Sequence, residues 1–449
     1  MKQSVKTFRA EAYDCLNNNI LPFWLNMQDE ERGGFYGQMT GRGTLVKDAE
    51  KGAVLNARIL WSFAAAYRVT GNAAYLDAAT RAKDYIMRHF IDREYGGVYW
   101  SLNADGTPKD TKKQSYAIGF TIYGLSEYAR CLAETEEQKY KSEAREALEM
   151  AISLFNDLES HAYDPAGDGY IEALTRDWQP LEDMRLSELD ENGSRTMNTH
   201  LHIIEPYTNL YRVWKDERLE KAIRRLLDIF TDKIMNPANH QLDLVFDDNW
   251  QGKRDIQSYG HDIEGSWLLH ETALVLNDKE TLARIEQVIR LIAVAASKGI
   301  IANGAMMHET NLPPNPLKGE FDFDSDFVSE SVSVSRSESE SRPESAPLLG
   351  GWGADSGADL HWWVQCENII GNFNLYQHFG DEQALEKALR CWQWTKENLI
   401  DRQNGEWHWS VRHDGTLNLD DDKAGFWKCP YHNSRMCLEI IERTSPLTP

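Results

Sequence analysis

The chain has 449 residues, with 48 Lys and Arg against 71 Asp and Glu, which gives a net charge of −23. This charge excludes nucleic acid and an anionic membrane surface as main partners, because both are bound through an excess of Lys and Arg. A neutral small molecule remains allowed. The 15 Trp and 18 Tyr, many of them beside Gly, His and Glu, favour a carbohydrate site, although large helical cores also use Trp.

The cysteines and the first residues of the chain show no pattern typical of a secreted or membrane protein. The six cysteines form no CxxC pair, so we expect reduced and mostly buried thiols rather than a disulfide framework or a zinc ribbon. The first residues lack an apolar leader, and no apolar run approaches the roughly 18 residues that span a bilayer. These features predict a cytoplasmic protein.

A short motif of turn, strand and turn recurs along the chain. In chain order its copies lie at residues 33–37, 92–106, 167–172, 243–247, 303–309 and 401–415. The segments 92–106 and 401–415 are the clearest pair and agree at 7 of 15 positions. Six copies in one chain predict six equivalent structural units.

Helical patterns of two kinds fill the intervals between these copies. One kind is apolar nearly all round, which is typical of buried helices, and begins near Gly52, Ser115, Asn198, Gly260, Asp359 and Pro430. The other kind is amphipathic and highly charged, as in residues 217–230, which is typical of surface helices. Strict alternation of six buried and six surface helices predicts an all-α fold, an (α/α)6 barrel with short β-hairpins in the loops at its mouth. We expect one catalytic domain over residues 1–449.

Residues 322–348 do not fit the repeat. The stretch 322–345 holds 9 Ser, 7 acidic residues and 2 Arg. Such a composition buries too little apolar surface to offset the entropy of ordering. We therefore predict a disordered insertion in a loop at the mouth, with a lid or a phosphorylation target as the alternative.

Histidine is the natural proton-transfer residue near neutral pH, and several histidines stand where inner helices begin. They are His200, His261, His361 and His432. Because the starts of the inner helices converge at the mouth, we expect at least three of these side chains to line one site. His200 and His202 cannot share a helix face, so one of them points inward and the other packs elsewhere.

Other polar residues at the same end complete the candidate site. His261 and Glu264 are spaced i, i+3, so the carboxylate can orient the imidazole. A metal site built on this pair is disfavoured, because no HExxH or equivalent spacing is present. Arg58 lies in an otherwise apolar helix and needs a partner, either a ligand oxygen or a structural carboxylate. Asp190 precedes Asn198 in a long loop, where an acidic residue is solvated by default.

At these residues the sequence resembles the N-acylglucosamine 2-epimerase superfamily, and within it the enzymes that act on β-1,4-linked disaccharides. The strings that carry the resemblance cover nearly the whole chain, apart from the Ser/Glu-rich insertion. They are residues 198–212 (NTHLHIIEPYTNLYR), 258–269 (SYGHDIEGSWLL), 361–367 (HWWVQCE) and 425–433 (GFWKCPYHN).

The resemblance implies epimerisation at C2 of the reducing-end sugar without a cofactor or metal, turning cellobiose into glucosyl-mannose and lactose into epilactose. His261 and His432 would be the acid/base pair, and His200 would assist ring opening. The implied substrate contacts are Arg58, Asn198, Glu264, Asp190, Trp363, Trp427, Tyr116 and Glu309. The implied partner is a small-molecule disaccharide, and the expected state is a monomer or homodimer.

Three other functions remain open. An aldose–ketose isomerase of the same superfamily would share the histidines. A glycoside hydrolase of the same fold needs two opposed carboxylates, whereas the motifs here centre on His. A sugar-binding protein without activity is the third.

Overall fold

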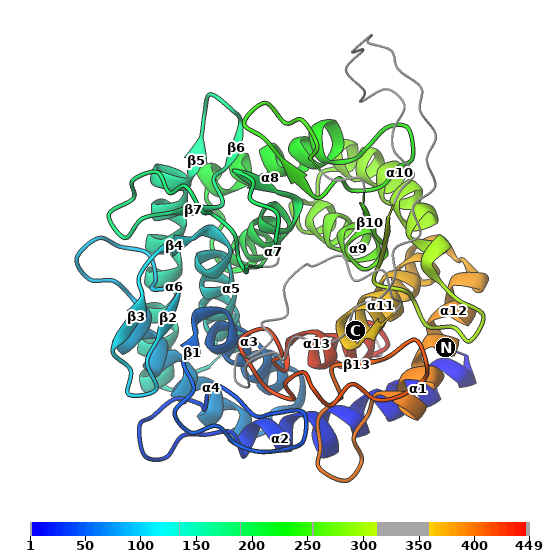
Figure 1. Cartoon of the computed structure of the whole chain (residues 1–449), viewed down its shortest axis with the longest axis horizontal. Coiled ribbons are helices and arrows are strands. Elements are labelled where there is room, and N and C mark those ends of the chain that lie inside the picture. The colour runs from blue at the N-terminus through cyan, green and yellow to red at the C-terminus, as the bar shows by residue number, and fades with distance from the viewer. Residues whose placement is uncertain (1, 134, 189, 254–255, 312–358, 446–449) are drawn as a thin grey trace, which may run out of the picture.

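The computed structural model describes residues 2–133, 135–188, 190–253, 256–311 and 359–445. Within these residues, six helices surround the centre of the molecule and alternate along the chain with helices of an outer ring (Figure 1). The inner helices are α3 (Ala53–Thr70), α5 (Ser115–Cys131), α7 (Met197–Val213), α9 (Tyr259–Leu276), α11 (Trp362–Phe379) and α13 (Tyr431–Arg443). Each begins within three residues of its predicted start, and the predicted (α/α)6 barrel is confirmed.

The outer helices cover this ring and are buried on one face only. They are α1 (Gln3–Cys15), α4 (Ala73–Tyr85), α6 (Gln138–Asp157), α8 (Glu217–Ile229), α10 (Lys279–Ala296) and α12 (Glu382–Asn398). In α8 the buried residues recur at helical spacing from Leu219 to Ile229, whereas α3 is buried without interruption from Ala53 to Ala66. A short helix, α2 (Leu21–Leu25), follows α1. Because α1 packs against α13, the first and last parts of the chain close the ring.

A hairpin follows each outer helix at the same end of the barrel. Its two sides are joined by an antiparallel bridge, and the bridged residues are Gln28 and Phe35, Ile91 and Val98, Tyr163 and Tyr170, Met235 and Leu242, Ile300 and Met306, and Ile400 and Trp407. The predicted sixfold repeat is therefore present. The fourth copy is displaced, since its hairpin precedes the predicted residues 243–247.

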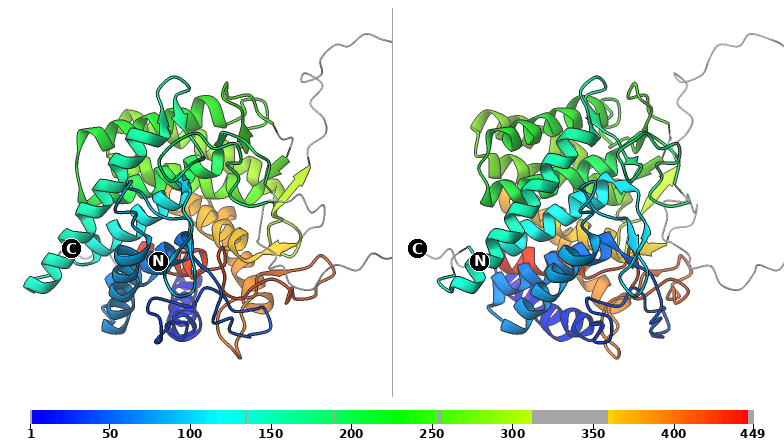
Figure 2. Two further views of the ribbon diagram at one scale, coloured as in Figure 1. Left: turned by 60° about the vertical axis from the view of Figure 1, so that its left-hand side comes forward. Right: turned by 90° about the vertical axis from the view of Figure 1, so that its left-hand side faces the viewer.

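Short antiparallel strand pairs link neighbouring units at this end (Figure 2). The linking pairs are β1 (Lys51–Gly52) with β2 (Ser101–Leu102), β4 (Lys113–Gln114) with β7 (Ala173–Leu174), β8 (Arg195–Thr196) with β9 (Val245–Phe246), β10 (Ile256–Ser258) with β11 (Glu309–Asn311), and β12 (Leu360–His361) with β13 (Ser410–Val411). Three further strands are β3 (Pro108–Asp110), which extends the first sheet, and β5 (Tyr163–Asp164) and β6 (Gly169–Tyr170), which pair with each other. A bridge between Met39 and Ala424 closes the circle.

Buried Lys–Asp pairs fix the hairpins to the residues that lead into the inner helices. Lys51 Nζ lies 2.9 Å from Asp29 Oδ2, and Lys113 Nζ lies 2.9 Å from Asp92 Oδ2; all four side chains are fully buried. The other oxygen of each Asp accepts backbone N–H groups of its own turn. Because such pairs tie the start of an inner helix to a rigid turn, they hold the mouth-side residues in place.

The predicted insertion at 322–348 lies outside the described residues. All six cysteines lie within them and are free thiols, five of them buried, as expected. None of the described helices is both long and apolar enough to cross a membrane.

Candidate active site

The starts of the inner helices bring most of the candidate side chains to one end of the barrel. Each inner helix contributes at least one: Arg58 from α3, Tyr116 from α5, Asn198 from α7, His261 and Glu264 from α9, Trp363 from α11, and His432 from α13. These helices lie far apart in sequence, so the site exists only when the ring is closed.

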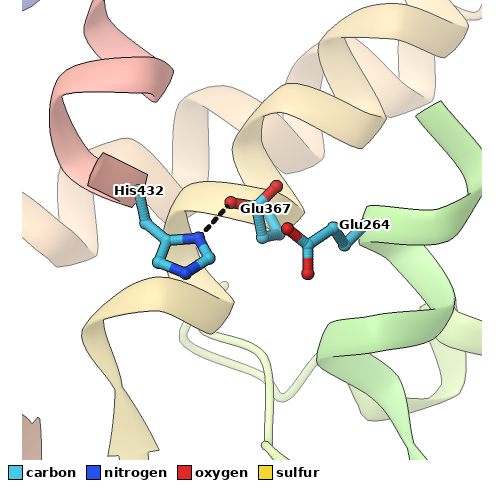
Figure 3. Close-up of side chains that lie close together, drawn as sticks. All are labelled: Glu264, Glu367 and His432. Atoms are coloured by element: carbon cyan, nitrogen blue, oxygen red, sulfur yellow. Dashed lines mark hydrogen bonds and ion pairs between the residues drawn. The ribbon is translucent and has the colours of Figure 1, made fainter. Parts of the chain in front are cut away.

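His432 is held by a network of buried charges (Figure 3). Its Nδ1 donates to Glu367 Oε1 at 2.7 Å. Arg435 Nη2 donates to the same oxygen at 2.7 Å and to Glu264 Oε1 at 2.6 Å, while its Nη1 pairs with Glu205. Since a carboxylate accepts the Nδ1 proton, Nε2 of His432 carries the free lone pair and can act as a base.

Burial controls the protonation of this network. Desolvation raises the pKa of Glu264 well above its usual value and also raises that of Glu367, and repulsion between carboxylates adds to both shifts. Desolvation, with Arg58 and Arg435 nearby, holds the pKa of His432 well below its ordinary value. The imidazole is therefore neutral at neutral pH, which a general base requires.

Glu264, Glu367 and His432 also form a potential metal-binding group, because one ligand atom from each lies within 4.8 Å of the others. Arg435, however, already donates to both carboxylates. Its guanidinium supplies the positive charge that a metal ion would supply, so the donor set fits an ion-pair network better than a metal centre. One oxygen of Glu264, Oε2, is buried without a hydrogen-bond partner among the described residues and is available to a ligand.

His261 and His432 both lie against Trp363. The ring centroids of His261 and Trp363 are 4.7 Å apart, and those of His432 and Trp363 are 5.6 Å apart. Ser258 Oγ lies 2.6 Å from His261 Nδ1 and fixes the ring. Glu309 pairs with Ser258 across β10 and β11. Burial lowers the pKa of His261 well below its usual value.

The structure does not support His200 as the third active-site histidine. Its Nδ1 donates to the backbone oxygen of Thr196 at 2.7 Å, and its Nε2 accepts the backbone N–H of Tyr170 at 3.0 Å. Both ring nitrogens are thus used by the backbone, and desolvation lowers the pKa to about 4. His200 is buried, and its bond to Tyr170 ties α7 to β6.

His202, two residues further along α7, lies against aromatic side chains of α5. Its ring lies 5.1 Å from that of Tyr116 and 4.9 Å from that of Phe120 between centroids, and desolvation lowers its pKa. Nδ1 donates to Glu205 Oε2 at 3.0 Å. Glu205 stays ionised, because Arg435 and His202 outweigh desolvation and lower its pKa to about 2.

A kink in α7 gives His202 this orientation. Pro206 stands four residues later and has no N–H to donate to the carbonyl of His202, so the helix departs from α geometry at His202 (φ −92°, ψ 17°). On α5, Gly119 faces that carbonyl so closely that a Cβ there would lie 2.3 Å from the oxygen. Pro206 is the sequence signal that distinguishes His202 from His200.

Arg58 is buried and makes no ion pair with any residue in the described ranges. Its Nη2 donates to Tyr116 Oη at 2.8 Å, and its guanidinium lies over the rings of Phe120 and Tyr431, at 4.1 and 4.8 Å from their centroids. Nε has no partner within the same residues. The sequence left two possible partners for Arg58, a structural carboxylate and a ligand oxygen. Because no carboxylate partner is present among the described residues, the ligand oxygen is favoured.

The remaining candidates lie around the same centre. The amide of Asn198 is buried, and neither its Oδ1 nor its Nδ2 has a hydrogen-bond partner among the described residues. Asp190 and Asn198 line one small cavity. Trp427, half-buried in the loop before α13, lies with its ring centroid 5.9 Å from that of Tyr116. His361 lies further out, with its ring 4.8 Å from that of His308.

Glu205, Glu367 and Arg435 are the residues that sequence reasoning missed. All three are fully buried charges on inner helices. Each could have been noticed as a charged residue in an otherwise apolar helix, as Arg58 was. Their contacts with one another join three helices, however, and therefore produce no spacing pattern in the sequence.

Comparisons with known proteins show the family of this chain. The profile of the family described as N-acylglucosamine 2-epimerase (GlcNAc 2-epimerase) matches residues 34–316 and 353–435. A cellobiose 2-epimerase of Bacteroides fragilis is 50% identical over 96% of this chain and 98% of its own, and one of Ruminococcus albus is 36% identical over 97% and 98%. The solved structure of cellobiose 2-epimerase from Bacillus thermoamylovorans superposes with a TM-score of 0.82 at 35% identity, covering 98% of this chain and all of the other. The chain belongs to the N-acylglucosamine 2-epimerase family.

Proposed function

We propose that this protein is a carbohydrate epimerase of the cellobiose 2-epimerase type, which inverts C2 of the reducing-end sugar of β-1,4-linked disaccharides. The observation that carries the proposal is a pair of buried neutral imidazoles, His261 on α9 and His432 on α13, on either side of α11 and both against Trp363. The 50% identity to a cellobiose 2-epimerase over nearly the full chain supports it.

The chemistry requires an open sugar ring. The proton on C2 becomes acidic only when C1 is a carbonyl, so the hemiacetal must first lose its O1 proton and pass a proton to the ring oxygen. His202 is suited to this exchange, since Glu205 holds its Nδ1 and leaves Nε2 toward the centre. We assign ring opening to His202 in place of His200.

Removal of the C2 proton then gives a cis-enediolate. One neutral imidazole takes the proton from one face of C2. The other, which must first take up a proton, returns one to the opposite face, so the two histidines exchange protonation states in each turnover. Arg58, which has no carboxylate to neutralise it in the described structure, is placed to stabilise the enediolate oxygen. Glu264 and Asn198, which have unpaired polar atoms, bind hydroxyl groups, and Trp363 and Trp427 stack on the sugar faces.

The test is NMR of cellobiose with the enzyme in D2O. We expect deuterium at C2 of the reducing residue and a new mannose-type anomeric signal, and His261→Ala and His432→Ala should each abolish inversion. Absence of exchange at C2 would reject the mechanism. A ketose as the main early product would favour the isomerase, and release of glucose would favour a hydrolase.

Further expectations accompany this proposal. The whole chain acts as one catalytic domain without cofactor or metal, in the cytoplasm, as a monomer or homodimer. Light scattering after size-exclusion chromatography measures the oligomeric state. Activity that survives exhaustive treatment with a chelator would agree with metal independence.

A further inference from the structure

A second cavity lies at the end of the barrel opposite the mouth, where the inner helices finish. Its volume is about 580 Å³, which is within the range of small-molecule sites. Residues from the middle and the C-terminal ends of all six inner helices line it, and none of them belongs to the histidine site at the other end.

The lining of this cavity has a net positive charge, whereas the whole protein has a net negative charge. Five cations line it: Arg68, Arg130, Arg212, Lys215 and Arg443. Four carboxylates line it: Glu127, Glu271, Glu439 and Glu442. In a chain of net charge −23, an excess of one positive charge in a cleft favours an anion there.

The arginines are engaged with glutamates, but Lys215 is not. Arg68 pairs with Glu127 and Glu442, Arg212 with Glu271, and Arg443 with Glu439. Arginines in a last turn also interact favourably with the negative end of the helix, which is the structural explanation for them. That explanation does not extend to Lys215, which follows the end of α7 at Val213.

Lys215 supplies the excess charge. Its Nζ lies 3.7 Å from the ring centroid of Tyr211 and makes no ion pair with a carboxylate of the described chain. Trp61, which also lines the cavity, has a buried indole Nε1 that lacks a hydrogen-bond partner within the same residues. The buried indole N–H is thus left to a ligand. Lys215 is exposed beside the cavity and has no competing carboxylate among the described residues.

We propose that this cavity binds a small polyhydroxylated monocarboxylate, the chemical class of the sugar acids. The carboxylate pairs with Lys215. The hydroxyl groups lie against the Arg–Glu pairs, which offer donors and acceptors side by side, and one of them accepts from Trp61. A single negative charge matches the single excess cation, whereas a multiply charged phosphate would meet four carboxylates at close range.

The test measures binding of D-gluconate to the full chain by titration calorimetry, with the neutral hexitol D-sorbitol and inorganic phosphate as comparison ligands. We expect Lys215→Ala to weaken gluconate binding by about tenfold or more, as loss of a charged hydrogen bond does. Lys221→Ala, a change of another exposed lysine on the neighbouring helix α8, should leave it unchanged. Trp61→Phe should weaken it without altering the fold.

A sugar acid resembles an open-chain sugar and could therefore also bind at the histidine site. The His432→Ala variant distinguishes binding at that site from binding in the second cavity. If the His432→Ala variant still binds gluconate and the Lys215→Ala variant does not, the second site is supported. This conclusion does not depend on the outcome of the epimerase test. The opposite pattern places gluconate at the mouth and overturns the proposal. Phosphate binding as tightly as gluconate, or no gluconate binding at all, also overturns it.

Discussion

The close approach of α5 to α7 makes Gly119 a sensitive position for the proposed ring-opening step. A methyl group on Gly119 would lie 2.3 Å from the carbonyl oxygen of His202, whereas ordinary contacts begin near 3.4 Å. Since the obstacle is backbone and not the end of a flexible side chain, the kink of α7 must move by roughly 1 Å in Gly119→Ala. Such a displacement of a reacting group costs about 100-fold in rate.

The assay compares kcat/KM for cellobiose epimerisation with the free energy of unfolding in urea. We expect Gly119→Ala to lose about 100-fold in kcat/KM and, from overpacking, about 1–3 kcal/mol of stability. The matched control is Gly71→Ala, at the end of α3. Gly71 has φ +70° and no atom near its missing Cβ, so alanine costs about 1–2 kcal/mol there without touching the site.

Two outcomes would refute the reasoning. If Gly119→Ala loses stability as expected but keeps kcat/KM within about twofold of the wild type, the position of His202 does not control the rate. If Gly71→Ala loses as much activity as Gly119→Ala, the loss reports general destabilisation.

Three further predictions follow from buried groups. Glu367→Gln replaces the carboxylate that holds Nδ1 of His432, so we expect kcat to fall by about 100-fold or more with little change in KM, and an unchanged kcat would contradict the role of this contact. Burial raises the pKa of Glu172 to about 7, above its unfolded value, so its contribution to stability is present below about pH 4.5 and is lost as the pH rises through about 7. Glu172→Gln should therefore flatten the fall in unfolding free energy over this range, and an unaltered pH profile of urea denaturation would show that Glu172 is not the titrating group. Lys428 and Glu406 form a fully buried pair at 2.6 Å, so Lys428→Met leaves Glu406 uncompensated and should cost about 3–5 kcal/mol, whereas a loss below about 1 kcal/mol would show that the pair is not needed.

The architecture could be predicted because its signals are local. Apolar residues all round a helix, amphipathic spacing and turn motifs are each read within about 20 residues, and their alternation admits few topologies. The same reasoning placed His261 and His432 at the mouth, since both stand where an inner helix begins. The repeat motif placed the fourth hairpin too late in the chain, at residues 243–247, because the motif is faint there.

The choice between His200 and His202 shows where local reasoning ends. Both lie in the first turns of one helix, and an ideal helix allows only one to face inward. The decision depends on a kink at His202, produced by Pro206 and accommodated by Gly119 on another helix. Without the neighbouring helix, neither the direction of the kink nor the free face of the imidazole is determined.

The sequence alone therefore determined the sixfold barrel, its mouth and the helices that supply the histidines. Only the tertiary structure decided which histidine faces the centre, that Arg58 has no carboxylate partner in the described chain, and that one arginine, Arg435, joins Glu205, Glu264 and Glu367. The physical reason is that periodicity and burial are properties of one segment, whereas ion pairs and protonation in a dry interior depend on charges from helices that are distant in the chain.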